Sequence, residues 1–190
     1  MVDVGKFFNK LKSKIKKCDN EYKVLRDQDG KMLKVYRGGE LNCRNGIFFS
    51  TDLETARDFG IDKIKYEANV KVKKPLIIDA KKNNYEYISY DGCLNSEMNN
   101  LKDKFYLFRN ELYLNNNYNN LSTDEYVRFA IQEKYDALII LNVCEGNNIG
   151  CENKITTDIV VWNRENLFNV RKITDDEPQI TNTIDVSELI

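Results

Sequence analysis

Residues 122–143, STDEYVRFAIQEKYDALIILNV, contain the clearest helix signal and the clearest strand signal of the chain. Ser122 with Glu125 three residues later is a capping-box pattern, which predicts a helix that runs to about Lys134. The side chains predicted to face inward on this helix are those of Tyr126, Phe129 and Ala130. Ala137 to Val143 is almost entirely apolar, which is typical of a buried strand. The region therefore predicts a helix that leads directly into a core strand.

Shorter strand signals lie on both sides of this region. Tyr22–Leu25 and Met32–Tyr36 flank residues 27–30, where Asp and Gly favour a tight turn, so together they predict a hairpin. Thr51 with Glu54 is a second capping-box pattern and predicts a helix that ends at Gly60. The other predicted strands are Ile47–Phe49, the alternating segment Ile64–Val72, Leu76–Ile78 between Pro75 and Asp79, Ile159–Trp162 and Val170–Ile173.

Helices are predicted in groups rather than in alternation with the strands. Residues 1–20 form an amphipathic pattern among lysines and are interpreted as a helix docked by one apolar stripe. Phe105–Leu114 is a further helix candidate, followed by an Asn-rich surface loop. This grouping favours an α+β fold with mixed or antiparallel sheets. We expect one domain over residues 1–173 and a polar, loosely docked C-terminal tail over residues 174–190.

The composition excludes several classes of protein and of site. With 190 residues, 42% of them hydrophobic and 31% charged, the chain fits one globular domain rather than a disordered segment. A formal net charge of -1 gives no global reason to expect nucleic acid or a membrane as the partner. No apolar run approaches a membrane span or a signal peptide, so a cytoplasmic protein is expected. The absence of histidine and the scattering of five cysteines argue against a metal site and against Ser/His or Cys/His nucleophiles.

Three segments carry the functional signal: VYRGG at 35–39, GIFFSTD at 46–52 and TDIVVWN at 157–163. In this order they resemble the three signature strands of the ADP-ribosyltransferase superfamily. The first is similar to the strand in which Arg or His precedes Gly. The second combines features of the Ser-Thr-Ser and Gly-Ile-Tyr-Phe elements of two branches, with Phe48 where one branch has Tyr. The third is similar to the strand that carries the catalytic Glu, and Asp158 stands at that position.

This resemblance covers roughly residues 33–173 and includes features seen in variants from phage and bacterial polyvalent proteins. It implies an ADP-ribosyltransferase-like α+β fold with split mixed or antiparallel sheets, an N-terminal helix and flanking helices. It also implies that NAD is a substrate and that no metal is required. The resemblance places a target-recognition turn at Glu145–Lys154.

Each predicted site residue has a physical role that suits NAD. Arg37 can make bidentate bonds to phosphate or ribose oxygens. Gly38 permits close backbone approach to the carboxamide, and either Phe48 or Phe49 can stack on the nicotinamide ring. Ser50 can orient the ribose or a carboxylate, and Asp158 can stabilise the positive charge that develops as nicotinamide leaves. Thr51 completes the predicted NAD-binding set and is also the expected helix cap.

Simpler interpretations of the same residues remain open. Arg37 can be a surface ion-pair partner, Ser50 can simply end a strand, and Asp158 can be a solvated residue at a strand entrance. Phe48 and Phe49 alternate faces of one strand, so at least one of them belongs to the core.

The combined expectation is a mono-ADP-ribosyltransferase that uses NAD to modify a macromolecular acceptor, preferably a protein. Two alternatives share NAD binding but differ in the reaction after it. A catalytically inactive protein of the same fold would act as a binding or inhibitor module, which the shorter Asp158 and the Phe48 substitution favour. An NAD glycohydrolase toxin would use water as the acceptor.

Overall fold

A computed structural model describes residues 21–41, 46–58, 65–94, 98–112, 120–144, 154–174, 181–187 and 189–190. The predicted helix at 1–20, the end of a helix at Gly60, most of the predicted turn at 145–154 and the acidic start of the tail lie outside these residues. The helices are α2 (Leu53–Asp58), α3 (Met98–Leu112) and α4 (Thr123–Gln132), with short 3-10 turns η1 (Tyr90–Gly92) and η2 (Arg164–Asn166).

Most of the described strands belong to one sheet. They are β1 (Lys23–Val24), β2 (Arg26–Asp27), β3 (Val35–Gly38), β4 (Ile47–Ser50), β5 (Lys65–Val72), β6 (Pro75–Asp79), β7 (Ile88–Ser89), β8 (Asn120–Leu121), β9 (Ala137–Cys144), β10 (Ile155–Val161), β11 (Leu167–Ile173) and β12 (Ile184–Asp185). The main sheet has eight strands in the order β1-β5-β3-β4-β10-β9-β6, and β11 also pairs with β5. β6 runs parallel to β9, whereas the other pairs of this sheet are antiparallel. The predicted α+β class with a mixed sheet is confirmed.

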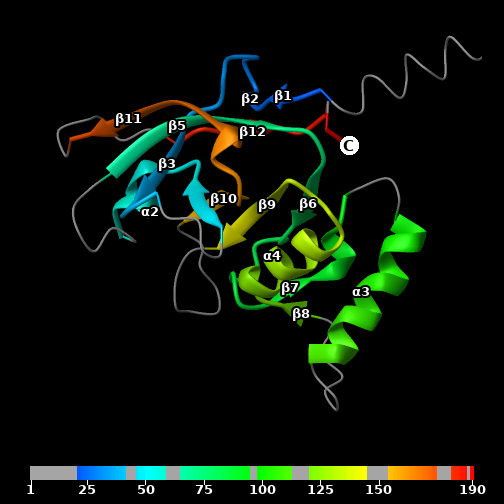
Figure 1. Cartoon of the computed structure of the whole chain (residues 1–190). Coiled ribbons are helices and arrows are strands. Elements are labelled where there is room, and N and C mark those ends of the chain that lie inside the picture. The colour runs from blue at the N-terminus through cyan, green and yellow to red at the C-terminus, as the bar shows by residue number, and fades with distance from the viewer. Residues whose placement is uncertain are drawn as a thin grey trace, which may run out of the picture.

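The sheet is curled (Figure 1). Two hydrophobic cores pack on its opposite faces: the outer core, which includes Leu76 and Phe105, and the inner core, which includes Ile77 and Ile139. Strands β5 and β9 are four places apart in the sheet, yet Ala68 of β5 and Ile139 of β9 belong to the same inner core. Consecutive residues of β6 face opposite cores: Leu76 packs on the outer side and Ile77 on the inner side. Burial on both faces explains why β6 and β9 are apolar at nearly every position.

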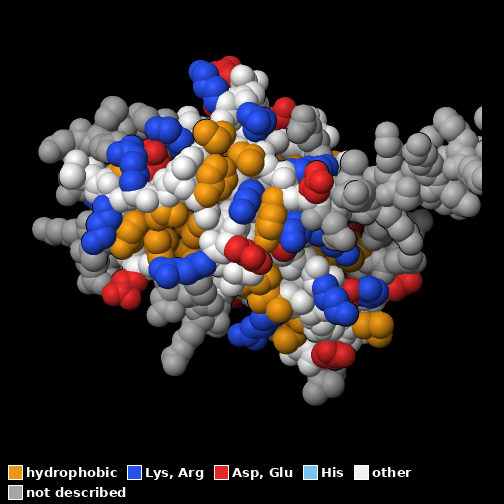
Figure 2. All heavy atoms as spheres, turned by 45° about the horizontal axis from the view of Figure 1, so that its top comes forward, with side chains coloured by type: hydrophobic (Ala, Val, Ile, Leu, Met, Phe, Trp, Pro, Cys, Tyr) orange, Lys and Arg blue, Asp and Glu red, His pale blue; other side chains and the backbone are white. Residues whose placement is uncertain are grey.

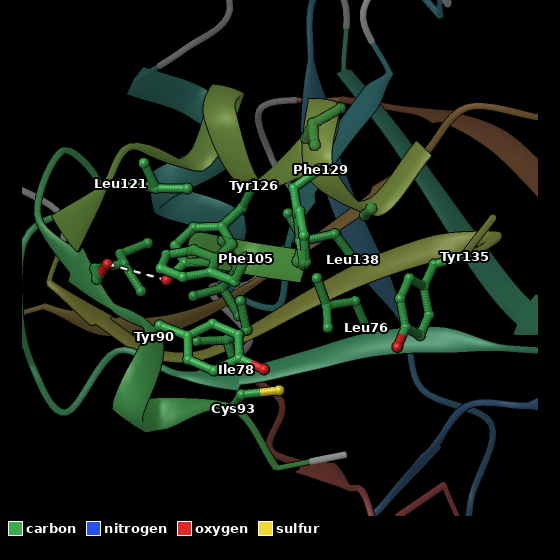
Figure 3. Close-up of a cluster of buried hydrophobic side chains, with 14 of the residues drawn as sticks. Leu76, Ile78, Tyr90, Cys93, Phe105, Leu121, Tyr126, Phe129, Tyr135 and Leu138 are labelled. Carbon is green, nitrogen blue, oxygen red and sulfur yellow. Dashed lines mark hydrogen bonds between the residues drawn. The ribbon is translucent and has the colours of Figure 1, made fainter. Parts of the chain in front are cut away.

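The outer core joins aromatic residues of α3, α4 and η1 to aliphatic residues of β6 and β9 (Figure 3). Phe105 lies at its centre, stacked on Tyr90 with 4.2 Å between ring centroids and perpendicular to Phe129. The Tyr126 hydroxyl donates to the Ile88 carbonyl oxygen over 3.1 Å, which supplies the partner that a buried phenol needs. Desolvation at these buried sites raises the pKa of Tyr126 and of Tyr90.

Several local predictions are confirmed by the structure. The N-terminal hairpin turns at residues 27–31, where the Gly30 N–H donates to the Asp27 carbonyl and Gly30 has φ +76°. The Ser122–Glu125 capping box is complete in both directions. The predicted strands after Pro75 and after Asp136 are β6 and β9. Each of these features depends on residues close together in sequence.

Other boundaries differ from the prediction. The α2 helix is capped by Asp52, whose Oδ2 accepts from the Thr55 N–H at 2.7 Å, because the Thr51 side chain is buried and accepts from the Thr157 N–H instead. The α3 helix begins at Met98 rather than near Phe105. Strand β10 begins at Ile155, so Asp158 lies inside the strand and not at its entrance.

The C-terminal residues contribute to the fold although their composition predicts a loosely docked tail. Ile184 and Asp185 form β12, which pairs with β2. Ile184 is buried in the inner core, and the Asn182 N–H donates to the Thr51 carbonyl at 3.0 Å. One well-placed apolar side chain and backbone pairing therefore hold a segment that is polar on average.

The exposed surface carries mixed charge. Figure 2 shows Lys and Arg side chains scattered among Asp and Glu on the face that it presents, without one large basic patch. No helix in the described ranges is long and apolar enough to cross a membrane.

Candidate active site

A cleft of about 500 Å³ brings together most of the residues predicted from the sequence. One wall is formed by β3, β4, β10 and the start of α2, and the other by residues 85–86 and 122–124. The volume falls in the roughly 300–1,000 Å³ range of small-molecule sites. Arg37, Gly38, Phe48, Phe49, Ser50 and Asp158 all border it, whereas Thr51 does not.

A row of three side chains crosses the strand wall. Tyr36 of β3 pairs with Ser50 of β4, and Ser50 pairs with Asp158 of β10. Directly opposed residues of antiparallel strands point to the same face of the sheet, and all three residues border the cleft. The register therefore places the Ser50 hydroxyl and the Asp158 carboxylate beside each other, although 108 positions separate them in the sequence.

Arg37 is held at the end of β3 by two backbone carbonyl groups. Its Nε donates to the Glu40 oxygen at 2.8 Å, and its Nη1 donates to the Phe48 oxygen at 3.0 Å. These acceptors are neutral, so they orient the guanidinium without cancelling its charge. Arg37 is half-buried, and its planar group lies at the edge of the cleft. Gly39 follows with φ +84°, a conformation that side-chain-bearing residues rarely adopt.

Asp158 is half-buried and sits next to a break in strand pairing. The register between β10 and β9 shifts between Thr156 and Asp158, which is a β-bulge or a similar irregularity. Bulges bend a strand locally and change the direction of a side chain, and they occur often beside active sites. Between Thr156 and Asp158, β9 advances three residues and β10 only two, so the extra residue lies in β9, where Asn142 has φ +53°, and Asp158 keeps its regular register opposite Ser50 of β4.

The Ser50 side chain lies at the base of the cleft within a buried set of hydroxyl groups. Its Oγ is 2.6 Å from the Thr156 Oγ1 and accepts from the Asp52 N–H at 3.1 Å. Thr51 lies behind it with 1% exposure, and its Oγ1 is 3.5 Å from the Thr156 Oγ1. Thr51 therefore supports Ser50 rather than facing the cleft. Sequence patterns did not indicate Thr156, because its contact with Ser50 spans two strands.

The side chains of the two phenylalanines of β4 point to opposite faces of the strand, as the alternation of a β-strand requires. Phe49 is 2% exposed and belongs to the inner core. Phe48 is half-buried and packs against the outer core at the cleft wall. The Phe48 ring is therefore the one of the two that is available for stacking on a planar ligand group.

Asp52 joins β4 to α2 just behind this wall. Its carboxylate caps α2 through Thr55 and also accepts from the Thr181 hydroxyl at 2.8 Å. Burial opposes ionisation, but the hydrogen bonds from Thr55 and Thr181, together with the Lys154 charge, lower the pKa of Asp52. The docked C-terminal segment thus contributes directly to the support of the site.

The second wall was not predicted from the sequence. Tyr85 and Glu86 come from the turn after β6, and the Tyr85 carbonyl accepts from the Thr123 N–H at 2.9 Å. This bond joins the turn to the start of α4. The turn begins with Lys81 and Lys82 at positive φ, and Asp79 stabilises it by accepting from the Lys81 N–H at 2.8 Å. The capping box at Ser122 predicted where α4 starts. No local sequence pattern indicated that the start of α4 borders the same cleft as β4.

The cleft has mixed charge. Glu86 and Asp124 are exposed carboxylates on the second wall, and they face a strand wall that carries Arg37 and Asp158. Within the described part of the chain, no three or more Cys, Asp or Glu residues gather in a way that could hold a metal ion. The groups that can act on a ligand here are a guanidinium, carboxylates, hydroxyls and aromatic rings.

Comparisons of the chain with protein-family models, with curated proteins and with solved structures find no match.

Proposed function

We propose that this cleft binds NAD and that the protein is a mono-ADP-ribosyltransferase of the ADP-ribosyltransferase-like fold. The observation that carries the proposal is the meeting of Arg37, Phe48, Ser50 and Asp158 at one cleft of about 500 Å³. Arg37, Phe48 and Ser50 come from two consecutive strands, whereas Asp158 comes from a strand 108 positions beyond Ser50. The residue type of each suits a different part of NAD, and strand pairing brings the distant Asp158 beside the other three.

The side chains that border the cleft suit different parts of NAD. The Arg37 guanidinium, oriented by two carbonyl groups, offers a fixed cation for the pyrophosphate or a ribose oxygen. The Phe48 ring offers an apolar face for nicotinamide. Asp158 and Ser50 lie opposite each other in the strand register, so an acceptor and a hydroxyl group are available side by side for the two hydroxyl groups of a ribose.

The reaction needs a carboxylate more than it needs a strong base. The bond between ribose C1′ and the nicotinamide nitrogen breaks, and its electron pair leaves with neutral nicotinamide. The ribose then carries oxocarbenium-like positive charge, which the ionised Asp158 stabilises. A lone pair of the acceptor attacks C1′, and the acceptor loses its proton. Because nicotinamide leaves uncharged, no protonated histidine is required for its departure.

Two other functions are compatible with NAD binding in this cleft. With water as the acceptor, the protein would be an NAD glycohydrolase. With Asp158 one methylene too short to reach the ribose, it would be a binding module that retains the fold without transfer. The shorter acidic side chain is the feature that favours the second alternative.

One assay separates the three. Nicotinamide release from NAD is measured with the full chain, with and without cell lysate, together with transfer of labelled NAD onto macromolecules. We expect release that depends on lysate and a labelled product. Nicotinamide release that occurs without lysate and gives no labelled macromolecule identifies a glycohydrolase. No release under either condition, with NAD binding seen by calorimetry, identifies the binding module, and absence of binding as well refutes the NAD site.

A further inference from the structure

Three buried hydroxyl groups form a chain that ends at the cleft. Thr51, Thr156 and Ser50 are 1%, 4% and 5% exposed. The Thr51 Oγ1 and Thr156 Oγ1 are 3.5 Å apart, and the Thr156 Oγ1 and Ser50 Oγ are 2.6 Å apart. Of the three residues, only Ser50 borders the cleft. This chain of hydroxyl groups therefore starts at Thr51, which is buried away from the cleft, and ends at Ser50, which borders the cleft.

The direction of the hydrogen bonds follows from counting protons. Each hydroxyl has one hydrogen, and a buried hydroxyl hydrogen without an acceptor is costly. If the chain runs from Thr51 to Thr156 to Ser50, every buried hydrogen has an acceptor and the Ser50 hydrogen points into the cleft. If it runs the other way, the Thr51 hydrogen has no acceptor among the residues that the structure describes. The first direction is therefore favoured.

The direction of these hydrogen bonds determines whether the Ser50 hydroxyl can donate to a ligand or accept from it. Its oxygen accepts from the Asp52 N–H at 3.1 Å and, in this direction, also from the Thr156 hydroxyl. Two accepted bonds occupy both lone pairs of the Ser50 oxygen, so the hydroxyl has only its hydrogen to offer. Ser50 then cannot accept a proton or a hydrogen bond from a ligand, but it can donate to one.

We infer that Thr156 is a positioning residue that makes Ser50 a hydrogen-bond donor toward an oxygen of the bound ligand. The identity of that oxygen, a ribose oxygen of NAD, rests on the proposed function. Hydrogen bonds in such chains strengthen one another, so the Thr156 hydroxyl also strengthens the bond that Ser50 donates. The donor at Ser50 lies beside the acceptor at Asp158, and a ribose hydroxyl pair can satisfy both.

The direction of the chain can be tested without any ligand. Hydroxyl protons that are buried and donated exchange slowly and are detectable by NMR. In the free full-length protein we expect a protected Thr156 hydroxyl proton with a nuclear Overhauser contact to the Ser50 β-protons, which is lost in Thr156→Val. A protected Ser50 hydroxyl proton directed at Thr156 would overturn the inference, whatever the protein does with NAD.

The effect on the ligand is tested with a double-mutant cycle on kcat and KM for nicotinamide release and on the Kd for NAD. Thr156→Val should lower kcat/KM about 3- to 10-fold, as expected for one hydrogen bond, and Thr156→Ser should restore it. In a Ser50→Ala background, Thr156→Val should have no further effect, because Thr156 acts through Ser50. Thr157→Val is the matched control, since Thr157 is also buried on β10 and its hydroxyl contacts neither Ser50 nor Thr156 among the described residues.

The outcomes of the two tests are separable. If Thr156→Val lowers kcat/KM equally in the wild-type and Ser50→Ala backgrounds, Thr156 has a purely structural role and the inference is overturned. An equal decrease of kcat/KM in Thr157→Val would have the same meaning. If Thr156→Val does not fold, Thr156→Ala takes its place in the cycle. If wild-type protein neither binds NAD nor releases nicotinamide, the proposed function fails, and the NMR experiment still decides the direction of the hydroxyl chain.

Discussion

Arg37 makes two structural hydrogen bonds that would also suit the binding role proposed for it. Its two bonds to the Glu40 and Phe48 carbonyl groups restrain the guanidinium before any ligand arrives. Preorganisation of this kind reduces the conformational entropy that is lost on binding. A lysine at this position would keep the charge but lose the planar fork that makes these bonds.

Arg37→Ala should therefore weaken NAD binding about 10- to 100-fold, the range for loss of a charge-assisted hydrogen bond. Arg37→Lys should recover only part of this loss. The measurement is the Kd by calorimetry, with the melting temperature as a check on folding. The matched control is Arg171→Ala, which breaks an ion pair with Glu67 away from the cleft and should leave the Kd unchanged. Equal weakening by both alanine variants would remove Arg37 from the binding site.

Substitution of Asp158 tests the proposed chemistry separately from NAD binding. Asp158→Asn removes the negative charge with little change of volume, so kcat should fall about 10²- to 10³-fold while the Kd for NAD changes little. Asp158→Glu restores the side-chain length found in the resembled family and should retain substantial activity. The controls are Glu86→Gln and Asp124→Asn, which remove the two carboxylates of the opposite wall. If Glu86→Gln is inactive and Asp158→Asn is not, the catalytic carboxylate lies on that opposite wall.

At the scale of elements, the junction between β4 and α2 depends on a segment far along the chain. Asp52 caps α2 and accepts from Thr181, and the C-terminal strand β12 pairs with the N-terminal β2. The cap therefore couples the cleft wall to the docking of residues 181–187. Loss of Asp52 should affect both the helix and the C-terminal segment.

The lowered pKa of Asp52 leads to a pH-dependent prediction. A carboxyl group whose pKa is lower in the folded state stabilises the protein above its unfolded pKa of 3.8, and this stabilisation is lost as pH falls through the folded pKa. Asp52→Asn keeps an amide oxygen for the cap but removes the charge. Its melting temperature should lie below that of wild type at pH 7, and the gap should close below about pH 4.

Asp52→Ala provides the comparison for the cap itself. This variant also removes the acceptor and should cost about 1 kcal/mol more at neutral pH, the usual value of an N-cap. Thermal unfolding followed from about pH 3 to pH 8 measures both effects. A gap between wild type and Asp52→Asn that stays constant over this range would show that the ionised Asp52 does not stabilise the fold.

At the scale of the whole molecule, two cores pack on opposite faces of one curled sheet, and the cleft is bordered by Phe48 and Tyr85, which pack against the outer core. The outer core packs α3 and α4 on β6 and β9, and the inner core is enclosed by the sheet and closed by Ile184. The second wall of the cleft is carried by elements of the outer core. The width of the cleft is therefore set by packing at a distance from it.

Phe105 is the side chain with which to test the packing of the outer core. It is fully buried, stacked on Tyr90 and in ring contact with Tyr126 and Phe129 (Figure 3). Phe105→Ala should lower the free energy of unfolding by about 3–5 kcal/mol, the usual range for a large cavity. Leu107→Ala on the same helix removes a side chain that is 65% exposed and should have little effect. Denaturant unfolding measures both, and equal losses would contradict the assigned core.

Much of the secondary structure follows from the sequence alone. The Ser122 capping box, the turn at Gly30 and the apolar β9 strand depend on residues within a few positions of one another. The residue types that line the strand wall of the cleft are likewise present in three sequence segments, at 35–39, 46–52 and 157–163. Local hydrogen bonding and burial patterns are sufficient for such features because neighbours in sequence are always neighbours in space.

Only the tertiary structure decided how these pieces meet. Strand register placed Ser50 opposite Asp158, and the pairing of Ile155 and Thr156 with β9 placed Asp158 inside β10 rather than at its entrance. The second wall at Tyr85 and Asp124, the Thr156 contact and the docking of Ile184 all join residues that are distant in sequence. Pairing across strands and burial between elements depend on the whole chain at once, so no local pattern records them.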